Sequence, residues 1–148
     1  MEESLKKYTT SEFSSFLNSA FDLPDQDIKS YSPLTLAYIG DAVFELLIRN
    51  MIVARANTSV NTMHNHATKI AQAKAQADIY FAIKDKLTEE ENSIFKRGRN
   101  AKSATTPKNA TLGDYRIATG VEALVGYLYL ENKFYRIIEL FKPELIIR

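Results

Sequence analysis

The chain of 148 residues has no cysteine and no tryptophan, and it has only five glycines and four prolines. The absence of cysteine excludes disulfides and thiolate metal sites, so any bound metal must be held by oxygen or imidazole ligands. Hard cations such as Mg²⁺ are then the expected metals. No apolar run reaches the length of a membrane span, and residues 1–7 lack the apolar core of a secretory signal. We therefore expect a cytoplasmic protein.

The residues that are present predict an all-α fold. Hydrophobic residues make up 45% of the chain and charged residues 25%, which suits one domain with a substantial core. Apolar residues recur at steps of three and four, and strict alternation is absent. The spacing predicts helices over residues 11–21, from Pro33 to about Ala56 with Ser32 as N-cap, and from residue 58 or 59 to about Lys84.

The second half of the chain continues the helical pattern. Thr88 and Glu91 match a capping box, which predicts a helix that ends near Gly98. Asp114 is the expected cap of a helix that extends to about Leu130, and a last short helix should end before Pro143. In the long helix before Lys84, the residues expected to point inward are Val60, Met63, Ala67, Ile70, Ala77 and Phe81.

Charge is unevenly distributed along a chain whose formal net charge is only +1. Residues 1–30 carry six acidic side chains against three basic ones, whereas residues 92–113 carry five basic side chains and no acidic one. The second segment is rich in small hydroxyl and amide side chains. This composition favours a polyanion-binding loop, and the alternative is a solvated surface loop that happens to be basic.

Two acidic residues, Asp41 and Glu122, lie within the most apolar predicted helices. Burying a carboxylate is costly unless its charge is compensated. Glu45 has Arg49 one turn further along its helix as a favourable ion-pair partner, which leaves Asp41 without an obvious local one. Either a distant arginine such as Arg116 or a divalent cation shared by the two carboxylates could compensate the charges.

The surroundings of Glu122 indicate the wall of a pocket. Tyr115, Thr119, Glu122 and Gly126 fall within about 60° of arc at the helical period. Glu122 therefore shares its face with a hydroxyl group and with a residue that has no side chain, which we interpret as a pocket wall and not as a packed seam.

These motifs resemble a known family. Residues 38–45 (YIGDAVFE) are similar to the signature helix of ribonuclease III, and residues 121–126 (VEALVG) to its second acidic motif. The closer resemblance is to Mini-ribonuclease III, the small form that lacks a double-stranded-RNA-binding domain, because residues 96–103 and 105–109 also fit its pattern. The resemblance implies a single-domain, all-α helical bundle of the ribonuclease III endonuclease-domain type over residues 31–148. Residues 1–30 would form an N-terminal extension with a short helix.

The resemblance implies that Asp41 and Glu122 are the catalytic residues and that they ligate Mg²⁺, or Mn²⁺ in its place. The metal would activate water for phosphodiester hydrolysis and leave 5′-phosphate and 3′-hydroxyl ends. The larger ribonuclease III enzymes have glutamates at the positions of Leu34 and Ala37 and an aspartate at that of Thr119. Having fewer carboxylates leaves the number of metal ions open.

The resemblance also implies a homodimer that cleaves double-stranded RNA, with ribosomal (23S) precursor RNA as the substrate and a large-subunit ribosomal protein as a possible helper. A-form RNA is read mainly through its phosphates, 2′-hydroxyls and shape. The residues expected to contact it are Lys96, Arg97, Arg99, Lys102, Ser103, Thr105, Thr106, Lys108 and Asn109. Lys69, Lys74 and Arg116 are weaker candidates.

Two other classes of function remain open on the sequence. One is a catalytically inactive RNA-binding or ribosome-assembly module on the same helical scaffold. The other is a helical protein-interaction domain, which would have no affinity for duplex RNA.

Overall fold

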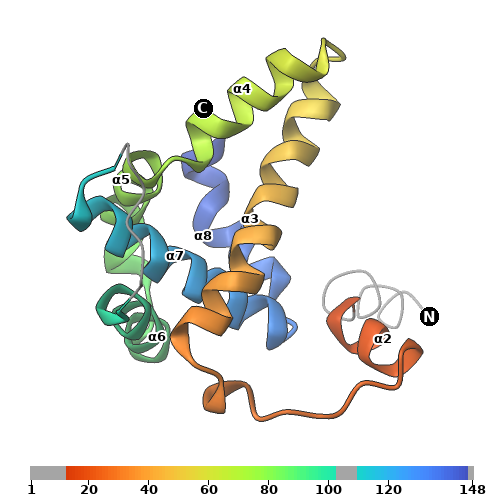
Figure 1. Cartoon of the computed structure of the whole chain (residues 1–148), viewed down its shortest axis with the longest axis vertical. Helices are drawn as coiled ribbons and strands as arrows, with labels where there is room; N and C mark the ends of the chain where they lie inside the picture. Colours follow the sequence, from red (N-terminus) through yellow and green to blue (C-terminus); the bar gives the residue numbers. More distant parts are fainter. Residues whose placement is uncertain (1–12, 103–109, 147–148) are drawn as a thin grey trace.

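The computed structural model describes residues 13–102 and 110–146, and every regular element in these ranges is helical, which confirms the all-α prediction. Figure 1 shows the arrangement of the helices. The expected RNA contacts Ser103, Thr105, Thr106, Lys108 and Asn109 lie outside the described residues, as does the expected first turn at Ser11. The elements are α2 (Phe13–Ala20), η1 (Ile28–Ser30), α3 (Pro33–Arg55), α4 (Val60–Ala71), α5 (Ala73–Ile83), η2 (Lys84–Lys86), α6 (Glu89–Asn100), α7 (Leu112–Leu130) and α8 (Phe134–Leu145).

Helix α7 is the centre of the bundle, and α3, α5, α6 and α8 pack around it (Figure 1). Most of its middle is buried: Val121, Ala123, Leu124 and Val125 have no exposed surface, and Glu122 among them is half-buried. A helix that is apolar all round must be enclosed by others. None of the described helices is both long and apolar enough to cross a membrane.

Two predicted helix starts are confirmed. The Ser32 hydroxyl accepts a hydrogen bond from the Thr35 amide (3.1 Å), and Pro33 occupies the first helical position of α3. At α6 the capping box is complete: the Glu91 amide donates to Thr88 Oγ1 (3.1 Å), and the Thr88 amide donates to Glu91 Oε1 (2.9 Å). Both caps satisfy amides that the first helical turn leaves unpaired.

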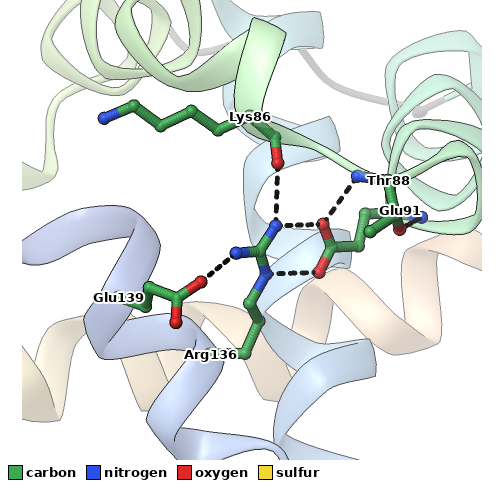
Figure 2. Close-up of polar contacts among 5 residues, drawn as sticks. All are labelled: Lys86, Thr88, Glu91, Arg136 and Glu139. Carbon is green, nitrogen blue, oxygen red and sulfur yellow. Dashed lines mark hydrogen bonds and ion pairs between the residues drawn. The ribbon is translucent and has the colours of Figure 1, made fainter.

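A second set of contacts fixes the start of α6 against α8, as Figure 2 shows. The Arg136 guanidinium donates from Nε to Glu91 Oε2 and from Nη2 to Glu91 Oε1, each at 2.8 Å, and Nη2 also donates to the Lys86 carbonyl (2.8 Å). Arg136 Nη1 pairs with the exposed Glu139. Burial raises the pKa of Glu91, but the hydrogen bonds from Arg136 and Thr88 outweigh it, and the net pKa is lowered.

The expected helix up to Lys84 is wrong as one continuous element, because the chain breaks at Gln72, whose backbone is extended (φ −60°, ψ 148°). Because α4 and α5 are separate helices, residues spaced by three or four across the break do not lie on one common face. Ala67, Ile70 and Ala77 are buried as expected, and Met63 packs against the core. Phe81 is 56% exposed, and Val60, in the first turn of α4 where the hairpin with α3 projects (Figure 1), is 77% exposed.

Two other boundaries differ from the prediction. The N-cap of α7 is Thr111 and not Asp114: the Asp114 amide donates to Thr111 Oγ1 (3.1 Å), so Asp114 lies inside the first turn. Helix α8 continues through Pro143 to Leu145. Inside a helix proline removes one hydrogen bond and crowds the carbonyl four residues earlier, at a cost of about 3 kcal/mol. The burial of Phe141 and Leu145 on either side of Pro143 offsets this cost.

Candidate active site

Helices α3 and α7 cross in backbone contact at the position of the two acidic motifs. A Cβ atom built on Gly40 would lie 1.7 Å from the Glu122 carbonyl oxygen, and one built on Gly126 would lie 2.0 Å from the Leu36 carbonyl oxygen. Only glycine fits at both points. Gly126 is therefore part of a packed seam, and its interpretation as a pocket wall is wrong. The crossing brings Asp41, which follows Gly40, next to Glu122.

The two carboxyl groups repel each other's charge. The pKa of the half-buried Glu122 is raised to about 8, first by burial and then by the negative charge of Asp41; a polar interaction with the Gln76 side chain lowers it, and Glu45 raises it slightly. The pKa of Asp41 is raised by partial burial and by Glu45. Asp41, Glu45 and Glu122 therefore concentrate negative charge where α3 and α7 cross.

No ion pair compensates Asp41 or Glu122 within residues 13–102 and 110–146. Glu45 pairs with Arg49 (2.8 Å), as expected. Pairing of Asp41 with Arg116, the structural alternative, is not found. A cation shared by the two side chains would stabilise both carboxylates in their charged form.

The donor set suits a hard cation of the magnesium type. In the described part of the chain, no group of three or more His, Asp or Glu side chains is placed to hold a metal. A metal at this site would therefore take its acidic ligands from Asp41 and Glu122. Mg²⁺ is often bound by one or two carboxylates, with water and substrate phosphate completing its shell. Thr119 is a weaker candidate metal ligand, because its buried hydroxyl donates to the Tyr115 carbonyl within α7 (3.0 Å).

Gln76 is a residue of this site that sequence analysis missed. It lies on α5 with only 2% of its surface exposed, and its side chain interacts with Glu122. Its Nε2 donates to the Ala71 carbonyl (2.9 Å). The only sequence signal is an amide among small residues, in the run from Ala73 to Ala77, on a helix predicted to pack inward.

The basic end of α6 lies beside the turn of α7 that leads to Glu122. A Cβ atom on Gly98 would lie 2.8 Å from the Ala123 Cβ atom and 2.9 Å from the Gly120 Cα atom, so the two helices are in close contact there. Lys96, Arg97 and Arg99 belong to the last two turns of α6, and Lys102 follows the helix. The structure thus fixes the helix that carries Lys96, Arg97 and Arg99 against α7 at Gly120 and Ala123, on either side of Glu122 in the sequence.

Two of these cations are partly engaged with the protein. Arg97 is exposed, and its Nη2 donates to the Tyr31 carbonyl (3.3 Å). Arg99 donates from Nε to Asn100 Oδ1 (3.2 Å), and its Cζ lies 5.9 Å from the centre of the Phe95 ring. Lys96 and Arg97 also line an open cleft together with Pro33, Glu89, Asn92, Ser93, Asn100 and Ala101.

The weaker RNA-binding candidates are dispersed. Lys69 lies in the last turn of α4, Lys74 in the first turn of α5 and Arg116 in the second turn of α7, and all three are exposed. Lys74 is two residues from Gln76 and is therefore the candidate closest in sequence to a residue that contacts Glu122. The structure shows no feature that gathers the three into one surface.

Comparisons with known proteins place this geometry in a family. The ribonuclease III domain model matches residues 34–133. The Mini-ribonuclease 3 of Thermoanaerobacter sp. is 51% identical over 122 residues, 82% of this chain and 86% of that protein, and the Mini-ribonuclease 3 of Clostridium tetani is 48% identical over 118 residues, 79% and 78% of the two chains. A crystal structure of a protein from Fusobacterium nucleatum is 34% identical, with a TM-score of 0.75, and the match covers 82% of this chain and 98% of that one. The chain therefore belongs to the ribonuclease III family, and within it to the Mini-ribonuclease 3 group.

Proposed function

We propose that this ribonuclease is a metal-dependent endonuclease that cleaves double-stranded RNA, with ribosomal (23S) precursor RNA as its substrate. The observation that carries the proposal is the pair of carboxylates at the crossing of α3 and α7. Asp41 and Glu122 come from distant parts of the chain, are held together by backbone contact at Gly40, and have no cationic partner among the described residues.

Asp41 and Glu122 would hold Mg²⁺, with Mn²⁺ as a substitute. When bound, the cation polarises the phosphate and lowers the pKa of water, which yields 5′-phosphate and 3′-hydroxyl ends. The chain's own contribution is positional. The packed seam of α3 and α7 fixes the backbone on which both carboxylates stand, so that little reorganisation is needed when substrate arrives.

The cations of α6 would bind the RNA backbone next to the acidic pair. Duplex RNA is recognised through phosphates, which suits exposed lysine and arginine side chains. Lys96, Arg97 and Lys102 are exposed, while Arg99 is half-buried and held near Phe95. The proposed RNA surface extends to the residues outside the described ranges, Ser103, Thr105, Thr106, Lys108 and Asn109, with Lys74 and Arg116 at its edges.

We further propose a homodimer in which each site cuts one strand. The face of α3 opposite α7 carries large exposed apolar side chains: Tyr38 is 82% exposed, Leu46 64% and Val53 62%. Such a stripe is typical of an interaction surface. A two-fold symmetric dimer suits a duplex whose strands are related by approximate dyads. Action in the cytoplasm, with a large-subunit ribosomal protein as partner, rests on the family resemblance alone.

Substitution of one ligand separates catalysis from binding. Asp41→Asn should abolish Mg²⁺-dependent cleavage of a radiolabelled RNA duplex while salt-sensitive binding of the duplex is retained. Asp85→Asn, which changes an exposed acid in η2, is the matched control and should cleave as the wild type does. If the wild type leaves every duplex intact in Mg²⁺ but binds it, the inactive RNA-binding module is the correct function.

The role of the basic end of α6 is tested by the salt dependence of binding. Lys96→Gln and Arg97→Gln should each weaken duplex binding and reduce the slope of log K against log salt concentration by about one ion. Arg55→Gln, in the last turn of α3, is the control. An unchanged slope in both α6 variants would exclude direct phosphate contact by these side chains.

A further inference from the structure

The open cleft beside α6 changes in charge along its length. Lys96 and Arg97 line one part of it, and Glu89, about two turns earlier on the same helix, lines another. Glu89 is exposed and forms no ion pair with any residue that the structure describes. A phosphate group in the cleft is attracted by the two cations and repelled by the carboxylate. It should therefore bind at the end formed by Lys96 and Arg97.

Uncharged polar side chains lie between the two ends of the cleft. Asn92 and Ser93 come one turn before Lys96 and Arg97, at the three- and four-residue spacing that puts side chains on one face of a helix. The half-buried amide of Asn92 and the hydroxyl of Ser93 make no hydrogen bond within residues 13–102 and 110–146. Both groups can donate and accept. They suit a neutral hydroxyl-bearing partner better than a second anion.

Duplex RNA carries such a group close to each phosphate. The ribose 2′-hydroxyl is neutral, both donates and accepts, and is the group by which a protein distinguishes RNA from DNA. A surface for phosphates alone has no use for the carboxylate of Glu89, whereas a hydroxyl can donate a hydrogen bond to it. The cleft has a volume of about 790 Å³, which is in the size range of sites for small organic ligands and leaves room for a sugar beside the phosphate.

We propose that Asn92 and Ser93, together with Glu89, form a subsite for ribose 2′-hydroxyl groups of the strand whose phosphate is held by Lys96 and Arg97. The inference rests on the proposed function, since it takes duplex RNA as the substrate. The cations supply an attraction that DNA and RNA share, because it depends on phosphate charge alone. The uncharged subsite supplies the part of the binding that DNA cannot match.

The test compares the binding of two duplexes of one sequence to the full chain, by fluorescence anisotropy in EDTA. One duplex is ordinary RNA, and in the other fluorine replaces each 2′-hydroxyl, which keeps the A-form shape but removes the donor. The wild type should prefer the ordinary RNA. Asn92→Ala should reduce this preference about fivefold, the effect of losing one neutral hydrogen bond, and should leave the slope of log K against log salt concentration unchanged.

Two further variants serve as references. Lys96→Gln should weaken the binding of both duplexes equally and reduce the salt slope, because it removes a phosphate contact. Asn18→Ala, which changes an asparagine of α2 away from the cleft, should bind both duplexes as the wild type does.

The possible results separate the subsite from the proposed function. A wild type without preference, or an Asn92→Ala variant that keeps the full preference, would overturn the subsite and leave duplex RNA as the substrate. An equal loss of affinity for both duplexes, or a reduced salt slope, would assign Asn92 to phosphate contact or to the fold and would also overturn it. A wild type that binds neither duplex would overturn the proposed function as well. Melting curves show whether Asn92→Ala is folded; if it is not, Ser93→Ala, at an exposed position, decides by the same comparison.

Discussion

Replacing Gly40 by alanine is expected to force α3 and α7 apart and so to separate the two carboxylates. The new Cβ atom would lie 1.7 Å from the Glu122 carbonyl oxygen, whereas ordinary van der Waals contacts begin at 3.4 Å, so the helices would have to move apart by as much as about 1.7 Å. The obstacle is backbone and cannot rotate away. Overpacking of this kind costs about 1–3 kcal/mol, or more where backbone must move.

Alanine also favours the helix by about 1 kcal/mol over glycine, which offsets part of that cost. We therefore expect Gly40→Ala to lose about 2 kcal/mol of unfolding free energy, measured by urea denaturation in EDTA. The rate of cleavage in single-turnover assays should fall about 100-fold, because a displacement of about 1 Å between catalytic groups has that effect.

Gly113→Ala is the matched control. Gly113 lies in the first turn of α7, and a Cβ atom there would meet nothing within 4 Å. This variant should keep or slightly increase the stability and should cleave normally. Wild-type stability and cleavage in Gly40→Ala would refute the backbone contact at the crossing, and an equal loss in Gly113→Ala would show that the effect is not specific to it.

Three further predictions concern charge and capping. Burial and Asp41 raise the pKa of Glu122 from the usual 4.5 to about 8 in the folded state. The metal-free protein should therefore lose roughly 2–4 kcal/mol of unfolding free energy as the pH rises from about 4.5 to 8. Glu122→Gln should remove this loss in urea melts made at each pH. Arg136→Met leaves the buried Glu91 without its partner and should cost about 3–5 kcal/mol in thermal or urea unfolding, whereas Glu139→Gln, at an exposed position, should cost less than about 1 kcal/mol. Thr88→Ala should cost about 1 kcal/mol by the same measurement, since it removes the cap of α6; no change would refute the capping box.

Features encoded by local sequence were predictable. The helical period gave the all-α class, and the caps at Ser32 and Thr88 were recognisable because a capping residue and its partner amide lie within three residues. The pairing of Glu45 with Arg49 follows from one helical turn in the same way. The acidic residues were noticeable because charge is unusual inside apolar helices.

Features that depend on contacts between distant segments were not predictable. The break at Gln72 has neither proline nor glycine to mark it, because it is set by how α4 and α5 pack on α3 and α7. The need for glycine at position 40 is evident only from the Glu122 carbonyl oxygen that lies against it in the folded chain. Gln76 likewise reads as an ordinary helical residue until its burial and its neighbour Glu122 are known.

The most direct measurement is anomalous X-ray diffraction from crystals of the protein grown with Mn²⁺. We predict a strong anomalous peak between the carboxylates of Asp41 and Glu122, within ligand distance of both, and its absence in crystals of Asp41→Asn. A peak at another place, or none at these two residues at saturating Mn²⁺, would contradict the shared-cation site on which the nuclease proposal depends.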